Sequence, residues 1–97
     1  MATTLPQDLA NSLKSYSIAI DYWEPFAGDT FLYVGQRQFL EEHWAELSAI
    51  QKTALKDVDN KVLALVGGQF EDVTEDVEDL RLIAGIINGS LAVQKAA

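Results

Sequence analysis

Apolar side chains recur every three or four residues in four segments of the chain, a spacing that places them on one face of an α-helix. The clearest segment lies between Ser48 and Gly68, where the apolar positions are Ile50, Ala54, Leu55, Val58, Val62, Leu65 and Val66. Ser48 stands three residues before Gln51, the spacing of a capping box at a helix start. Gly67 and Gly68 favour a helix end, because glycine adopts the left-handed closing conformation without a steric penalty. We therefore predict a helix over residues 49–66.

Two further segments precede this helix. The first has apolar residues at Leu9, Leu13, Tyr16, Ile20 and Trp23. It begins with Thr4 and Pro6, which are typical of a helix start, so we predict a helix over about 5–24. The second has Leu40, Trp44 and Leu47 on one face, which predicts a helix over about 31–47. Gly35 weakens its beginning, and residues 31–34 fit either its first turn or a short strand.

The fourth segment contains Val73, Val77, Leu80, Ala84 and Ile87 at helical spacing and predicts a helix over 73–88. Asp72 or Thr74 is suited to cap its start, whereas Asn88 and Gly89 favour its end. The following tail fits either a further turn of this helix or a frayed end, and its small residues favour fraying. Four amphipathic helices with short connections predict an all-α fold, a compact four-helix bundle formed by the single domain 1–97.

Composition and charge narrow the classes of partner. The 97 residues are 48 % hydrophobic, a slight surplus for one domain of this size, which favours a homodimer. The net charge of −8 repels phosphate backbones and anionic lipids, so we expect no nucleic-acid partner and no membrane partner. The absence of cysteine excludes disulfides and thiolate metal sites. No segment is typical of a secretory signal or a membrane span, so we expect a cytoplasmic protein.

Two groups of residues are candidate binding sites. The first, the acidic cluster, consists of Glu71, Asp72, Glu75, Asp76, Glu78 and Asp79, with no basic residue among them. It fits the solvated first turns of a helix, a cation site, or a surface for a basic protein. The second is an aromatic-rich loop between the first two helices, with Trp23, Phe26, Phe31 and Tyr33 as its candidate contacts. These aromatics fit a cap on the core, a protein interface, or a small-molecule pocket.

The candidate polar residues near that loop have simple structural explanations as well. Arg37 can form a polar edge of a pocket with Tyr33, but it also stands four residues before Glu41, the spacing of a helical ion pair. His43 and Glu46 have the spacing of two metal ligands on a helix. The chain has no second histidine to complete a site of that kind, so we interpret His43 as a residue at the edge of the core.

These features predict a small acidic protein–protein interaction or regulatory domain without catalytic activity and without a cofactor. In this interpretation the aromatic-rich loop serves self-association, and the acidic cluster binds a basic protein. The alternative is a protein that binds a small molecule through Tyr33, Arg37 and His43, or a divalent cation through the carboxylates of the acidic cluster.

Overall fold

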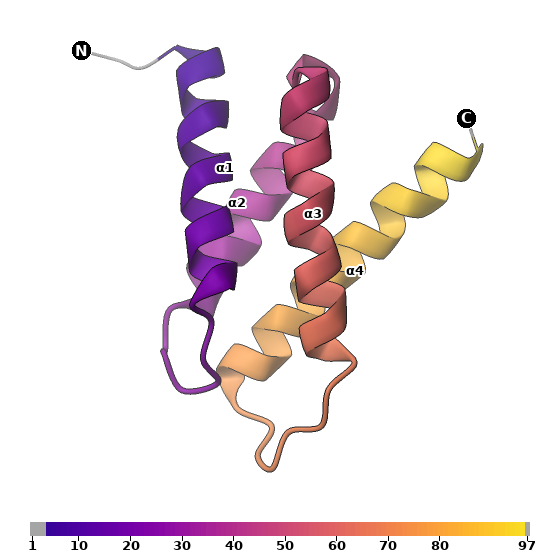
Figure 1. Cartoon of the computed structure of the whole chain (residues 1–97). Coiled ribbons are helices and arrows are strands. Elements are labelled where there is room, and N and C mark those ends of the chain that lie inside the picture. The colour runs from indigo at the N-terminus through magenta and orange to yellow at the C-terminus, as the bar shows by residue number, and fades with distance from the viewer. Residues whose placement is uncertain (1–3, 97) are drawn as a thin grey trace.

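The computed structural model describes the backbone of residues 4–96, in which the chain forms four α-helices and no strand. These helices are α1 (Leu5–Asp21), α2 (Thr30–Glu42), α3 (Ala49–Val66) and α4 (Glu75–Ala96), with a short 3₁₀ turn, η1 (Trp44–Glu46), between α2 and α3 (Figure 1). The predicted all-α four-helix fold is confirmed. Residues 31–34 belong to the first turns of α2, which settles the choice between helix and strand. Residues 1–3 and 97 of the predicted domain lie outside the described residues.

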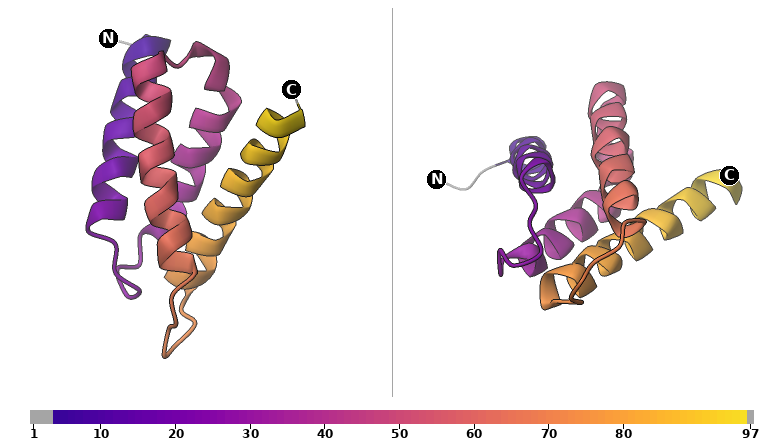
Figure 2. Two further views of the ribbon diagram at one scale, coloured as in Figure 1. Left: turned by 45° about the vertical axis from the view of Figure 1, so that its right-hand side comes forward. Right: turned by 60° about the horizontal axis from the view of Figure 1, so that its bottom comes forward.

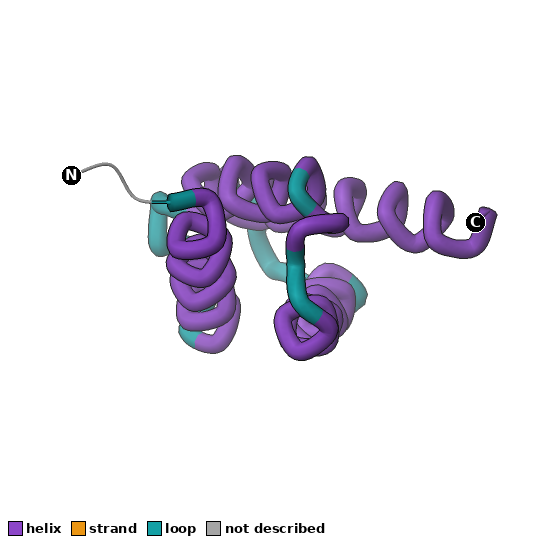
Figure 3. The backbone as a smooth tube through the Cα atoms, turned by 90° about the horizontal axis from the view of Figure 1, so that it is seen from above, coloured by secondary structure: helices purple, strands orange, loops and turns teal. Residues whose placement is uncertain are grey.

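The helices form two layers, with α1 and α3 in one and α2 and α4 in the other (Figures 2 and 3). Helix α1 packs on α2 and α3, and α4 packs on the same two helices. Helices α2 and α4 run in the same direction, with their N-terminal ends together at the lower end of Figure 1. The Cα atoms span 40 × 38 × 17 Å, the proportions of a flat two-layer bundle. No helix within residues 4–96 has the length and hydropathy needed to cross a membrane.

The apolar stripes of the four helices meet between the layers. The buried core consists of Leu9, Tyr16, Ile20, Leu40, Leu47, Leu55, Val58, Val62, Leu80, Ile83, Ala84 and Ile87. Nearly all of these positions lie on the stripes that the spacing predicts. Two residues of the predicted stripes are exposed: Ile50, in the first turn of α3, is 82 % exposed, and Val73, which precedes α4, is 55 % exposed. The fourth helix begins at Glu75, two residues later than predicted.

Local signals place most helix starts correctly. The capping box of Ser48 and Gln51 is present with both hydrogen bonds, at 2.9 and 3.1 Å. Thr4 caps α1, and the Thr74 hydroxyl accepts a hydrogen bond from the Val77 N–H in the first turn of α4. Helix α3 ends at Val66 as predicted, although Gly67 closes it in the right-handed rather than the left-handed conformation.

Three predicted helix ends are wrong. Helix α1 stops at Asp21, three residues earlier than predicted, and α2 stops at Glu42, where the chain tightens into η1. The predicted end of the fourth helix at residue 88 is also wrong, since α4 continues through Asn88 and Gly89 to Ala96. A glycine inside a helix costs about 1 kcal/mol relative to alanine but does not force an end. Burial of Ile87 and Ser90 on the inner side of α4 favours its continuation.

Candidate functional site

The two longer loops, residues 22–29 and 67–74, lie side by side at the end of the bundle where α2 and α4 begin (Figure 1). The Thr74 hydroxyl donates a hydrogen bond of 2.5 Å to the Pro25 carbonyl oxygen and so ties one loop to the other. The rings of Trp23 and Phe70 meet edge to face, with centroids 5.8 Å apart. This geometry is the favourable one for an aromatic pair. The two loops therefore form one continuous surface.

Asp76, in the first turn of α4, holds the end of the first loop in place. It is the one buried member of the acidic cluster, and its carboxylate accepts hydrogen bonds from the Gly28 N–H, the Thr30 N–H and the Thr30 hydroxyl. These groups lie at the start of α2, where the Asp29 side chain makes no capping bond. Asp76 thus supplies from α4 the cap that α2 lacks. Gly28 adopts a left-handed conformation, φ 81°, that a residue with a side chain rarely adopts.

The electrostatics of Asp76 agree with this structural role. Burial by itself would raise the pKa of the Asp76 carboxyl, but the hydrogen bonds from Thr30 and Gly28 outweigh it and lower the pKa. Trp23 completes the arrangement, since its indole N–H donates a 2.9 Å hydrogen bond to the Thr30 hydroxyl oxygen. The Asp76 carboxylate is therefore buried and hydrogen-bonded within the chain, so Asp76 does not belong to the exposed acidic surface predicted to bind a partner.

A groove lies between the two loops. It has a volume of about 290 Å³ and is lined by Pro25, Phe26, Gln69, Phe70, Glu71 and Asp72. Phe26 is 73 % exposed, although its side chain is large and apolar. Glu71 and Asp72 are exposed and bring two carboxylates to the same groove. The groove thus joins an apolar surface to negative charge, and it unites one residue of the aromatic-rich loop with two of the acidic cluster.

The other surface carboxylates of the acidic cluster follow Glu71 and Asp72 in the sequence. Glu75 and Glu78 are exposed and Asp79 is half-buried, all in the first turns of α4. None of the ion pairs formed by the described residues involves these three side chains or Glu71 or Asp72. Within the part of the chain that the structure describes, five carboxylates without an ion-pair partner therefore lie in the groove or in the first turns of α4.

The remaining candidates of the aromatic-rich loop do not line the groove. Trp23 is half-buried and supports the groove wall through Phe70 and Thr30. Phe31 is exposed on the first turn of α2. The Tyr33 hydroxyl donates to the Asp29 carboxylate at 3.3 Å. Burial, followed by the charge of Asp29, raises the pKa of that hydroxyl and keeps it a donor.

Arg37 is not available to a ligand because it is buried in the core, where only 1 % of it is exposed. Its Nε and Nη2 atoms donate to the two oxygens of Asp59 at 3.0 and 2.9 Å, and its Nη1 atom donates to Glu41 at 3.1 Å. The predicted pair with Glu41 is confirmed. The stronger partner, Asp59, was missed by sequence reasoning, although it stands four residues after Leu55 and therefore lies on the buried stripe of α3.

The buried pair includes a third member. The Tyr16 hydroxyl donates to Asp59 at 3.0 Å, so one carboxylate on α3 accepts hydrogen bonds from α1 and α2. Burial, and then the charge of Asp59, raises the pKa of Tyr16. Burial also raises the pKa of Asp59 against the opposing effect of Arg37. Two parallel hydrogen bonds from one guanidinium to both oxygens are nevertheless the geometry of an ionised pair, so Asp59 is a carboxylate.

His43 lies at the far end of α2 from Tyr33. It is half-buried, its ring packs edge-on against Phe39, and its Nδ1 atom is 3.8 Å from Glu46. Ten residues of helix, or about 15 Å, separate His43 from Tyr33, so the three candidate ligand-binding residues do not converge. Among the described residues no group of three or more histidine or acidic side chains is placed to hold a metal ion.

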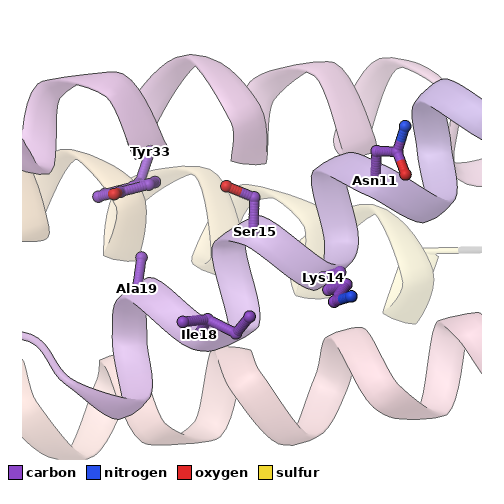
Figure 4. Close-up of a pocket in the computed structure, with 6 residues that line it drawn as sticks. All are labelled: Asn11, Lys14, Ser15, Ile18, Ala19 and Tyr33. Atoms are coloured by element: carbon purple, nitrogen blue, oxygen red, sulfur yellow. The ribbon is translucent and has the colours of Figure 1, made fainter.

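A second hollow, of about 350 Å³, lies between α1 and α2 and is lined by Asn11, Lys14, Ser15, Ile18, Ala19 and Tyr33. Ser15 and Ala19 point toward Tyr33, whereas Lys14 and Ile18 lie on the other side of the α1 ribbon (Figure 4). The polar groups therefore do not converge on one point, as they do in ligand sites.

No protein-family model, curated protein or solved structure matches the chain. The functional interpretation accordingly depends on the groove.

Proposed function

We propose that the chain is a small, non-catalytic protein-binding module that holds a short basic and apolar segment of another protein in the groove between its two loops. The observation that carries this proposal is the position of exposed Phe26 in the same groove as the carboxylates of Glu71 and Asp72. A segment that places an aliphatic or aromatic side chain next to a lysine or arginine matches both surfaces.

The apolar part of the groove supplies affinity. Covering an exposed phenylalanine side chain contributes about 1.5–3 kcal/mol. Aromatic residues are also enriched among the few positions that dominate protein interfaces. A volume of about 290 Å³ is at the low end for small-molecule pockets, but it accommodates a side chain of a partner.

The carboxylates supply selectivity. Five unpaired acidic groups in and beside the groove attract a basic segment and repel an acidic one. Because four of these five side chains are exposed and Asp79 is half-buried, their effect extends about 10 Å at 0.1 M salt and falls as the salt concentration rises. We therefore expect binding with an electrostatic component that is lost at high salt and an apolar component that is retained.

The groove is held in shape before any partner binds. Thr74 ties the loops together, and Asp76 fixes the loop that carries Phe26 through the Gly28 N–H. A binding surface that is already ordered loses less conformational entropy on association. The structural role of Asp76 thus supports the proposed binding role of its neighbours.

A library of short random peptides displayed on phage, selected on the immobilised full-length chain, tests the proposal. We expect enriched peptides to combine lysine or arginine with a large apolar residue. Fluorescence anisotropy of an enriched peptide should show about ten- to hundredfold weaker binding to Phe26→Ala. Glu71→Gln with Asp72→Asn should weaken binding about tenfold at low salt and less at high salt.

Two matched controls separate the groove from general effects of charge and hydrophobicity. Glu42→Gln with Asp57→Asn removes the same number of exposed carboxylates from α2 and α3. Ile18→Ala removes an exposed apolar side chain from α1. Both controls should bind like the wild type. The proposal is overturned if selection enriches no peptide, if the enriched peptides lack basic residues, or if the groove variants bind as well as the controls.

A further inference from the structure

The outer side of α4 carries no charge over most of its length. The sequence from Leu82 to Gln94 contains no charged residue, and the residues of this run that face the core are Ile83, Ala84, Ile87 and Ser90. The exposed ones are Leu82, Gly85, Asn88, Gly89, Leu91, Ala92 and Val93, of which only Asn88 has a polar side chain. Leu82 is 58 % exposed and Val93 is 70 % exposed. A helix that is uncharged and largely apolar on all sides is normally covered on all sides.

The other long helices differ from α4 in this respect. The exposed side of α1 includes Lys14 and Asp21, and that of α3 includes Lys56, Asp57 and Lys61. The position of α4 adds to the contrast, because its C-terminal turns extend past the other three helices (Figures 1 and 3). The uncharged side is therefore left uncovered by the rest of the described chain.

Two glycines in this surface have no role in the packing of the described chain. A Cβ atom added at Gly85 or Gly89 would meet nothing within 4 Å. A glycine in a helix interior destabilises the helix relative to alanine, and nothing inside the described chain requires the small size of Gly85 or Gly89. Residues 82, 85, 89 and 93 follow one another at spacings of three and four, so they share one side of the helix. The missing side chains let a second backbone approach this side closely.

We propose that this side of α4 packs against α4 of a second copy of the chain across a twofold axis, with Leu82, Gly85, Gly89 and Val93 at the contact. The absence of charge on this side of α4, in a strongly acidic chain, favours a second copy of the chain as the binding partner. In a twofold contact a residue close to the axis lies near its own counterpart, so a charge at that position faces a like charge. For a chain with a net charge of −8, an uncharged strip is a surface where two copies meet without that repulsion.

This contact is distinct from the loop groove. The carboxylates of Glu75 and Glu78 lie in the first turns of α4, before the uncharged run begins. A dimer formed through residues 82–93 therefore leaves Phe26, Glu71 and Asp72 free to bind a partner. The sequence analysis predicted self-association through the aromatic-rich loop. The uncharged, exposed side of α4 supports self-association through α4 instead.

Sedimentation equilibrium of the full chain tests the contact. We expect a dimer for the wild type at micromolar concentration. Gly89→Glu should raise the dimer dissociation constant at least about a hundredfold, because two like charges meet at the axis. This variant keeps the fold of the monomer, since its side chain enters open space and glutamate favours the helix. Ala10→Glu, an exposed site on α1, adds the same charge and should leave the dimer intact.

Single-cysteine variants test the location directly, because the wild-type chain contains no cysteine. Under mild oxidation at least one of Leu82→Cys, Gly85→Cys and Gly89→Cys should form a cross-linked dimer, since a disulfide needs Cα atoms within about 7 Å. Ala10→Cys should remain monomeric. A wild-type chain that sediments as a monomer overturns the proposal. So does a dimer that persists in Gly89→Glu, or one that none of the three α4 cysteines cross-links.

Discussion

The ion pair between Arg37 and Asp59 allows the most quantitative test of the fold. Asp59 is 6 % exposed and accepts three hydrogen bonds, one from Tyr16 and two from Arg37, all between 2.9 and 3.0 Å. Asp59→Asn keeps the shape of the side chain but removes its charge, which leaves the buried guanidinium with only Glu41 as a counter-charge. Removing one partner of a buried ion pair typically costs 3–5 kcal/mol. We expect a loss of about 3 kcal/mol, because Glu41 compensates in part.

Urea unfolding followed by far-UV circular dichroism measures this loss. A domain of this length has a free energy of unfolding of about 5–15 kcal/mol, so the expected loss is a large share of it. With a urea dependence of about 1–3 kcal/mol per molar, the midpoint should fall by at least about 1 M. Asp21→Asn is the matched control, because it makes the same chemical change in the exposed pair with Lys61 and should cost under about 1 kcal/mol. If Asp59→Asn costs no more than Asp21→Asn, the buried pair does not stabilise the fold as described.

Two further predictions concern the caps. The pKa of Asp76 is lowered from 3.8 in the folded chain, so its carboxylate adds stability above that pH and loses it as the pH falls through the lowered value. Asp76→Asn should therefore lower the free energy of unfolding by about 1.5–3 kcal/mol at pH 7 and by progressively less as the pH falls below 3.8. A loss that does not change with pH, measured by urea unfolding, would contradict the assignment. Ser48→Ala removes half of the capping box of α3 and should cost about 1 kcal/mol, which lowers the melting temperature by roughly 4–8 °C. An unchanged melting temperature in a calorimetric scan would show that α3 does not depend on its cap.

Sequence patterns predicted the features that depend on neighbouring residues. The start of α3 follows from Ser48 and Gln51, and the start of α1 follows from Thr4, because each cap is made within one turn. The helix ends were harder to predict. Asn88 and Gly89 have the local preference for a stop, but the buried side chains on either side of them keep α4 helical.

The pairs between helices were missed because sequence spacing does not reveal which helices face each other. Arg37 and Asp59 are 22 residues apart, and Asp76 is 46 residues from Thr30. A usable signal was nevertheless present. Arg37, Asp59 and Asp76 all stand three or four residues from buried leucines on the inner stripes, and a charge in such a place needs a partner. The candidate site shows the same division, since Phe26 and the acidic cluster were each identified, whereas their meeting in one groove required the fold.

The most direct test of the proposed function is a ¹⁵N–¹H correlation spectrum of the full chain, titrated with a selected peptide that contains a basic and an apolar residue. We predict that the largest shift changes occur at Phe26, Gly28 and residues 69–72, with small changes in α1. Shifts concentrated in α1 or in the uncharged half of α4, with the two loops unaffected, would contradict the groove as the binding site.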